Sequence, residues 1–168
     1  MEKTTNLYSL TLKEYKSYLF ATLFVAGNIA LPQLCHLIPN GGLIILPIYF
    51  FTLVAAYKFG WRVGIMCGIA SPLINHLLFG MPGAEMLSII MVKSTILAIA
   101  ASAIAQKTKS VSLALLTLAV LSYQIFGTLI EWAMVQDFYV AIQDFRLGLP
   151  GMALQVIGGY LILKNWKR

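Results

Sequence analysis

Polar side chains that would be costly in lipid gather in one stretch of an otherwise apolar sequence, "SPLINHLLFGMPGAEMLSIIMVKST" at residues 71–95. Asn75, His76, Glu85 and Lys93 fall there within a few helical turns of one another. Ionisable groups inside a membrane are expensive, and they most often mark a pathway or a binding site. The chemistry that these residue types offer is charge pairing and hydrogen bonding in a site shielded from water.

Lys93 is the most demanding of these groups. It lies about ten residues into a predicted membrane span, so at about 1.5 Å per residue it is about 15 Å from the end of that span, too deep for its ammonium group to reach the headgroups. It must therefore face a partner, a cavity or a ligand. Glu131 or Glu85 is the expected partner, and such a pair either ties helices together or belongs to a site. Together the three residues would suit a ligand with both an acidic and a hydrogen-bond-donating group.

Other polar residues have two open interpretations each. His76 is either a hydrogen-bonded packing residue or a ligand contact. Gln124 and Gln155 lie inside predicted spans, where they serve as interhelical hydrogen bonds or as site residues. Trp132 is an interfacial anchor, or it stacks on a planar ligand beside Glu131.

Motifs for catalysis and metal binding are missing from the sequence. There is no HExxH, GxSxG or Asp-rich phosphotransfer pattern, and His36 and His76 lack a nucleophile at a justified spacing. Cys35 and Cys67 form no metal-ligand spacing, and no GxxxxGK[ST] phosphate loop occurs. We therefore expect no enzyme activity, no metal and no cofactor, and any energy for transport must come from partner subunits.

The composition identifies the elements that must position these groups as membrane helices. Of the 168 residues, 60% are apolar and only 11% are charged, and the mean hydropathy is strongly positive. No separate soluble domain has room to fold, so residues 1–168 are interpreted as one all-α integral membrane domain. The net charge of +6 is distributed in ones and twos between apolar runs, which argues against nucleic-acid binding.

Apolar runs and the Gly, Pro and Asn residues between them predict six transmembrane helices. Their approximate ranges are 17–38, 43–58, 61–79, 84–106, 110–135 and 146–164. With the N-terminus in the cytoplasm, ten of the twelve Lys and Arg residues fall on the inner side, Lys93 and Arg146 being the exceptions. Both termini are then cytoplasmic, and His76, Glu85 and Glu131 converge with Lys93 on the outer half of the membrane.

Two pairs of small residues indicate close helix contacts. Ala26 and Ala30 are one turn apart in the first span, and Gly64 and Gly68 repeat that spacing in the third. Small residues at i and i+4 allow another helix to approach closely. Packing between helices of this chain is the favoured interpretation for Gly64 and Gly68.

The order of these features resembles the substrate-binding S components of energy-coupling factor (ECF) vitamin transporters. The resemblance covers nearly the whole chain: six spans, Ala-x-x-x-Ala in the first, then "GGLIILPIYFFTLVAAYKFGWRVGIMCGIASPLINHLLFG" with its Gly-Gly, Leu-Pro, short aromatic-rich span, glycine turn and closing "FG". Each motif is loose, and no substrate-specific signature of a subfamily is found.

The resemblance implies a function and a set of contacts. The face with Ala26 and Ala30 would dock on a membrane T component, with two cytoplasmic ATPases driving the cycle in a prokaryotic cytoplasmic membrane. A small water-soluble vitamin or precursor would bind near the outer face under the 33–42 loop, which includes Asn40. The candidate contacts are Glu85, Lys93, Tyr123, Gln124, Glu131 and Gln155, with His76 added from its position.

A second class of function stays open beside this one. A small ion-coupled carrier or a structural membrane subunit would use Lys93 and Glu131 as a proton relay or as a tie between helices. An intramembrane enzyme is disfavoured by the missing motifs.

Overall fold

The computed structural model describes residues 10–166, and within that range the chain is all-helical, as the sequence predicts. Four helices are long and apolar enough to cross a membrane: α1 (Tyr15–Cys35), α4 (Trp61–Phe79), α5 (Ala84–Thr108) and α6 (Leu113–Val135). They correspond to the first, third, fourth and fifth predicted spans, with boundaries that shift by a few residues.

The second predicted span, 43–58, is a broken helix. It consists of α2 (Gly41–Ile45), the 3-10 turn η1 (Pro47–Tyr49) and α3 (Phe50–Phe59). The break falls at Leu46, which has a left-handed backbone with φ of 48°. Pro47 explains it, because proline has no N–H to donate and disfavours helical backbone in the residue before it.

The last predicted span, 146–164, is also divided. Its first residues belong to α8 (Gln143–Leu147), which follows α7 (Phe138–Ala141), and only α9 (Leu149–Asn165) runs down the bundle. The 17 residues of α9 extend about 25 Å, somewhat less than the roughly 30 Å of a bilayer core. The second and last predicted spans are therefore each interrupted, and their short helices α2, α7 and α8 lie at one end of the bundle.

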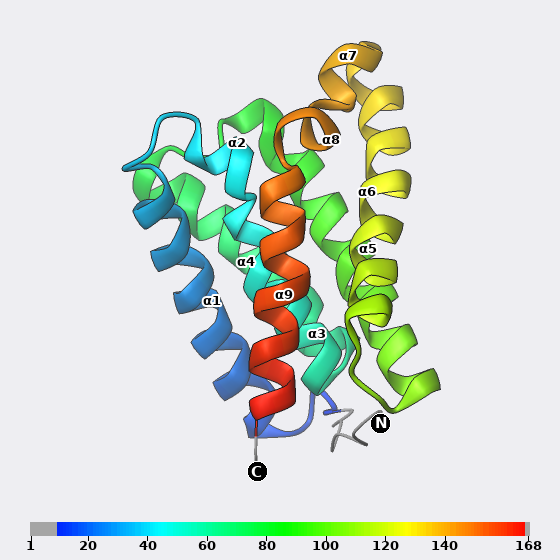
Figure 1. Ribbon diagram of the computed structural model, residues 1–168. Coiled ribbons are helices and arrows are strands. Elements are labelled where there is room, and N and C mark those ends of the chain that lie inside the picture. The colour runs from blue at the N-terminus through cyan, green and yellow to red at the C-terminus, as the bar shows by residue number, and fades with distance from the viewer. Residues whose placement is uncertain (1–9, 167–168) are drawn as a thin grey trace.

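The centre of the bundle is α3, which contacts α1, α4, α5 and α9 (Figure 1). The four residues from Leu53 to Ala56 have no exposed surface, so this helix is covered on every side. A helix in that position has no solvent-facing side, which is why its sequence is mostly apolar, with Thr52 and Lys58 as exceptions.

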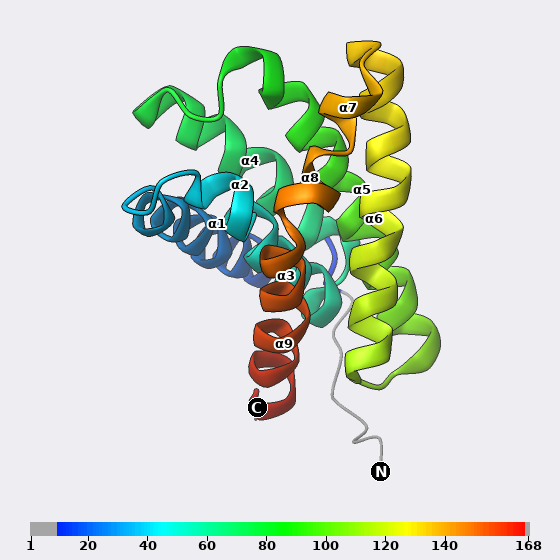
Figure 2. The same cartoon turned by 45° about the horizontal axis from the view of Figure 1, so that its top comes forward.

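Both ends of the described chain lie at the same end of the bundle, here named the terminal end (Figure 1). The backbone N–H of Leu10 donates to the Phe59 carbonyl at 3.1 Å, and the Trp166 ring packs 5.7 Å from the Phe59 ring. The opposite end, here named the α8 end, carries α2, α7, α8 and the connection between α4 and α5 (Figure 2). An even number of passages along the bundle explains why the two ends of the chain meet.

The distribution of polarity is the reverse of that in a soluble protein. Large apolar side chains are exposed along all the long helices, for example Leu23 at 58% and Leu77 at 72%, whereas polar side chains are buried between helices. A soluble monomer rarely exposes so much contiguous apolar surface. The surface suits lipid contact.

Glycines allow the closest contact between the long helices. A Cβ at Gly64 would lie 2.5 Å from Ala56 Cβ, and one at Gly68 would lie 2.8 Å from Ser94 Cβ. The prediction that these two glycines serve internal packing is confirmed. Ala26 and Ala30, in contrast, are exposed on α1.

Candidate functional site

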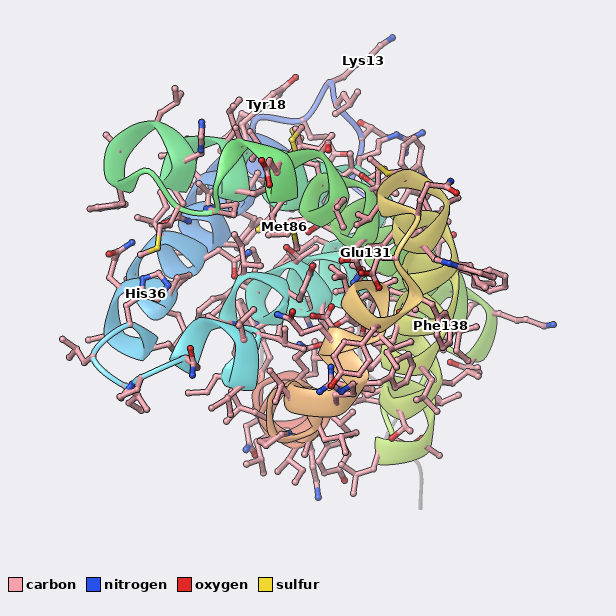
Figure 3. All side chains as sticks on the ribbon, turned by 90° about the horizontal axis from the view of Figure 1, so that it is seen from above. Lys13, Tyr18, His36, Met86, Glu131 and Phe138 are labelled. Atoms are coloured by element: carbon pink, nitrogen blue, oxygen red, sulfur yellow. The ribbon has the colours of Figure 1, made fainter. Side chains whose placement is uncertain are left out.

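A cluster of three charges joins α5, α6 and α8 near the α8 end. Lys93 Nζ lies 2.5 Å from Glu131 Oε2 and 2.7 Å from Asp144 Oδ2. The side chains of Lys93 and Glu131 are each 3% exposed, and that of Asp144 is 14% exposed. We name Lys93, Glu131 and Asp144 the charge triad; seen from above, Glu131 points to the interior of the bundle (Figure 3).

The path of the Lys93 side chain depends on a glycine in the neighbouring helix. A Cβ at Gly127 would lie 2.7 Å from Lys93 Cγ, so the lysine stem crosses α6 where α6 has no side chain. Glu131 is one turn further along α6, which places its carboxylate at the end of that stem. Lys93 therefore meets its partner without leaving the helix interface.

The third charge, Asp144, is positioned by the end of α8 and the turn that follows it. The carbonyl of Asp144 accepts a bond from the Gly148 N–H at 2.9 Å, which ends α8. A Cβ at Gly148 would lie 2.5 Å from Leu46 Cδ1, and one at Gly151 would lie 2.3 Å from the Ile45 carbonyl oxygen. Close approach of the 148–151 segment to α2 thus fixes α8 over the bundle, with Asp144 facing Lys93.

A second polar group lies deeper in the bundle. The Tyr123 hydroxyl donates to Gln155 Oε1 at 3.2 Å, and Gln155 Nε2 donates to the Leu46 carbonyl at 3.4 Å. The Tyr49 ring packs on the Tyr123 ring with centroids 5.0 Å apart. Of the two expected roles for Gln155, the structure shows the interhelical hydrogen bond. Its acceptor, the Leu46 carbonyl at the helix break, also accepts from the Tyr49 N–H at 3.4 Å.

One face of α6 carries buried polar atoms without partners. Among the described residues, neither amide atom of Gln124 has a hydrogen bond, nor does the Thr128 hydroxyl, although Gln124 has no exposed surface. Gln124, Thr128 and Glu131 are spaced i, i+4 and i+7, so they share that face. Buried polar groups in folded proteins are almost always paired, and one that is not needs an explanation such as a missing ligand or water.

The charges of the triad do not balance. It contains one ammonium and two carboxylates, which sum to −1 when all three are ionised. Arg146, the nearest basic residue in sequence to Asp144, is exposed and lies with its guanidinium carbon 3.6 Å from the centre of the Tyr139 ring. The triad thus holds one more acid than base, and an unpaired charge there would be costly in a medium of low dielectric constant.

Three residues predicted for the site lie elsewhere. His76 Nδ1 is 2.7 Å from the Pro82 carbonyl oxygen, a contact that stabilises the turn between α4 and α5. Glu85 is exposed in the first turn of α5, about two turns from Lys93. Asn40 is exposed and has a left-handed backbone before α2. Of the two expected partners of Lys93, Glu131 is therefore confirmed, and Asp144 occupies the place proposed for Glu85.

Asp144 and Tyr49 are members of the site that sequence reasoning missed. Asp144 lies two residues before the last predicted span, 146–164, and so outside every predicted helix. A carboxylate just before an apolar run was the available signal, but only the fold brings it beside Lys93. Trp132 is 46% exposed and stacks edge-on against Phe138, with centroids 5.3 Å apart, which fits the interfacial anchor.

A separate polar cluster ties α1, α3 and α4 together. Asn28 Nδ2 donates to Thr52 Oγ1 at 3.0 Å, and Asn28 Oδ1 accepts the Phe51 N–H at 3.1 Å. Asn75 Nδ2 donates to the Asn28 carbonyl at 3.0 Å, and Asn75 Oδ1 accepts from Gln33 at 3.3 Å. The paired amides show a structural tie, which accounts for Asn75 without a ligand.

Comparison with known proteins adds no identification: no family model, curated protein or solved structure matches this chain. Within residues 10–166, no group of three His, Cys, Asp or Glu side chains is placed to hold a metal ion. The charge triad and the unpaired Gln124 and Thr128 on α6 offer charges and hydrogen bonds that suit the binding of a small molecule.

Proposed function

We propose that this protein is a membrane-embedded substrate-binding subunit of the ECF type. It captures a small water-soluble vitamin or precursor at the outer face of a prokaryotic cytoplasmic membrane and delivers it inward. The observation that carries the proposal is the buried charge triad together with the unpaired Gln124, on the same face of α6 as Glu131. Buried polar groups without partners favour a ligand over a purely structural role.

The proposed orientation follows from the two ends of the bundle. In this proposal the chain passes six times through the membrane, so both termini lie on one side, the cytoplasm, and the α8 end lies outside. Basic residues support this assignment, because they gather around the terminal end, next to the ends of α1, α4, α5 and α9: Lys13, Lys16, Arg62, Lys107, Lys109 and Lys164. The charge triad then lies in the outer half, where a ligand from outside would reach it.

The proposed partners are a membrane T component and two cytoplasmic ATPases. The exposed Ala26 and Ala30 on α1 support a docking surface, because small side chains let another helix approach closely and no helix within residues 10–166 covers them. The other pair of small residues, Gly64 and Gly68, packs against helices of this chain and is therefore not available to a partner. In this proposal the chain itself performs no bond-breaking chemistry.

The test is to purify the protein without partners, denature it and identify any released small molecule by mass spectrometry. A near-stoichiometric vitamin-like compound is expected, and Gln124→Leu should reduce the amount retained. In a parallel pull-down, Ala26→Leu should impair recovery of the T component while leaving the retained ligand unchanged. Absence of both a ligand and these partners would contradict the proposal.

A second candidate, an ion-coupled carrier, is favoured by the surplus carboxylate of the triad, since two acids around one lysine can take up a proton. The two functions differ in what they require. A carrier moves its substrate across the membrane of a proteoliposome without ATPases, and a substrate-binding subunit alone does not.

A further inference from the structure

The charge of the site narrows the class of ligand. Lys93 is already paired with both Glu131 and Asp144, at 2.5 and 2.7 Å, so its ammonium group is not available to an acid without breaking these contacts. A ligand carboxylate would add a third acid to a site that already holds two acids around one lysine. The acidic ligand expected from the sequence does not fit this arrangement.

Asp144 is the member of the triad that an incoming group would meet first. Its side chain is 14% exposed, against 3% for the other two, and α8 carries it at the α8 end of the bundle. A positively charged group that pairs with Asp144 leaves Lys93 with Glu131. Each charge then has one opposite partner, and the site becomes neutral.

The surrounding side chains favour a planar group. Gln124 presents an adjacent donor and acceptor, both without a partner among the described residues and both fully buried. Tyr49 and Tyr123 place two aromatic rings nearby, and Tyr49 lies within electrostatic range of Asp144 and Glu131. Aromatic faces attract cations, and the unpaired Gln124 Oε1 can accept from an N–H group of a planar cation.

We propose that the site binds a planar, cationic ligand of the amidinium or protonated nitrogen-heterocycle class, whose charge pairs with Asp144 and one of whose N–H groups donates to Gln124 Oε1. This inference rests on the proposed substrate-binding function and makes it specific. It predicts that an anion of the same size and shape is rejected, because like charges in a site shielded from water repel strongly.

The test uses three probes of nearly equal shape: benzamidine (a cation), benzamide (neutral) and benzoate (an anion). Their binding to the purified protein in detergent is measured by calorimetry and by the shift in unfolding temperature. Benzamidine is expected to bind at least about tenfold more tightly than benzamide, which corresponds to a single net charge pair of modest strength. Benzoate is expected not to bind.

Asp144→Asn is the decisive variant, and Asp137→Asn is its matched control. Asp137 is an exposed acid at the same end that caps α7 by accepting from the Tyr139 and Val140 N–H groups, which an asparagine oxygen can also do. In Asp144→Asn, benzamidine should bind no more tightly than benzamide. The affinity for benzamide should stay within about twofold of that of the unmodified protein, which would show that the site is still folded. Asp137→Asn should change neither.

Several results would overturn the inference: benzoate binding best, equal binding of the three probes, no binding of any, or an unchanged preference in Asp144→Asn. The molecule released from the denatured protein separates this inference from the proposed function. A retained anion would overturn the cationic class while supporting substrate binding. Absence of a retained molecule together with absence of partners would contradict the proposed function itself.

Discussion

Lys93→Met removes the only cation of the charge triad and leaves two carboxylates facing each other in the bundle. The variant keeps the length and most of the apolar stem, which crosses α6 at Gly127. At an effective dielectric constant of about 20, each contact of Lys93 with Glu131 or Asp144 corresponds to about 6 kcal/mol of Coulomb attraction before desolvation. Most of that attraction is offset by the loss of hydration.

The net effect follows from which charge remains unpaired. Removal of one partner from a buried ion pair costs about 3–5 kcal/mol, so Lys93→Met should destabilise the fold by at least that amount. Glu131→Gln or Asp144→Asn leaves one ammonium with one carboxylate, and each should cost only about 1.5–3 kcal/mol. The triple variant with all three groups neutral should recover most of the loss, because neutral replacements of buried charges are often tolerated.

Equilibrium unfolding by SDS in mixed micelles, followed by circular dichroism, measures these differences. Lys107→Met is the control: Lys107 is an exposed lysine in the last turn of the same helix, and its replacement should change stability by less than about 0.5 kcal/mol. If Glu131→Gln were as damaging as Lys93→Met, or if the triple variant were the least stable, the unbalanced triad would be the wrong account of this site.

Three further perturbations test the packing, the site and the orientation. Gly151→Ala should lower stability by about 1–3 kcal/mol in the same assay, since its Cβ would lie 2.3 Å from a backbone oxygen, whereas Gly83→Ala, with nothing within 4 Å, should be nearly neutral. Gly127→Ala should displace the Lys93 side chain and reduce the amount of ligand retained by several-fold, as measured by mass spectrometry. Unchanged retention would contradict the close passage of Lys93 over Gly127. In right-side-out vesicles, a membrane-impermeant maleimide should label Glu85→Cys and spare Lys107→Cys, and the reverse pattern would invert the proposed topology.

The long helices could be predicted from sequence because their signal is local. The third, fourth and fifth predicted spans agree with α4, α5 and α6 to within three residues at each end, since apolar runs bounded by Gly, Pro or Ser determine where a helix begins and ends. The Lys93–Glu131 contact was also predictable, because a deeply placed ammonium needs a carboxylate and few are available.

Asp144 and Tyr49 could not be predicted, because their places depend on tertiary contacts between short elements. Nothing local distinguishes Asp144 from an acid in a loop, and its pairing with Lys93 joins residues 51 positions apart. The break at Leu46 was hidden by the continuous apolar sequence around it, although Pro47 is visible. His76 and Glu85 were assigned by proximity in sequence, whereas the rotation of α4 and α5 directs their side chains to the turn and to the surface.

The interrupted helices and the unmet polar groups have a common physical origin. Helices as short as α2 and α8, with five residues each, are not stable alone and hold their positions through contacts to the bundle. Two of those contacts are the bond of Gln155 to the Leu46 carbonyl and the ion pair of Asp144 with Lys93. A continuous helix would have bonded the Leu46 carbonyl to its own backbone, and without the separate turn of α8 the Asp144 side chain would not be held over Lys93. The breaks are therefore what allow this apolar chain to present polar chemistry in its interior.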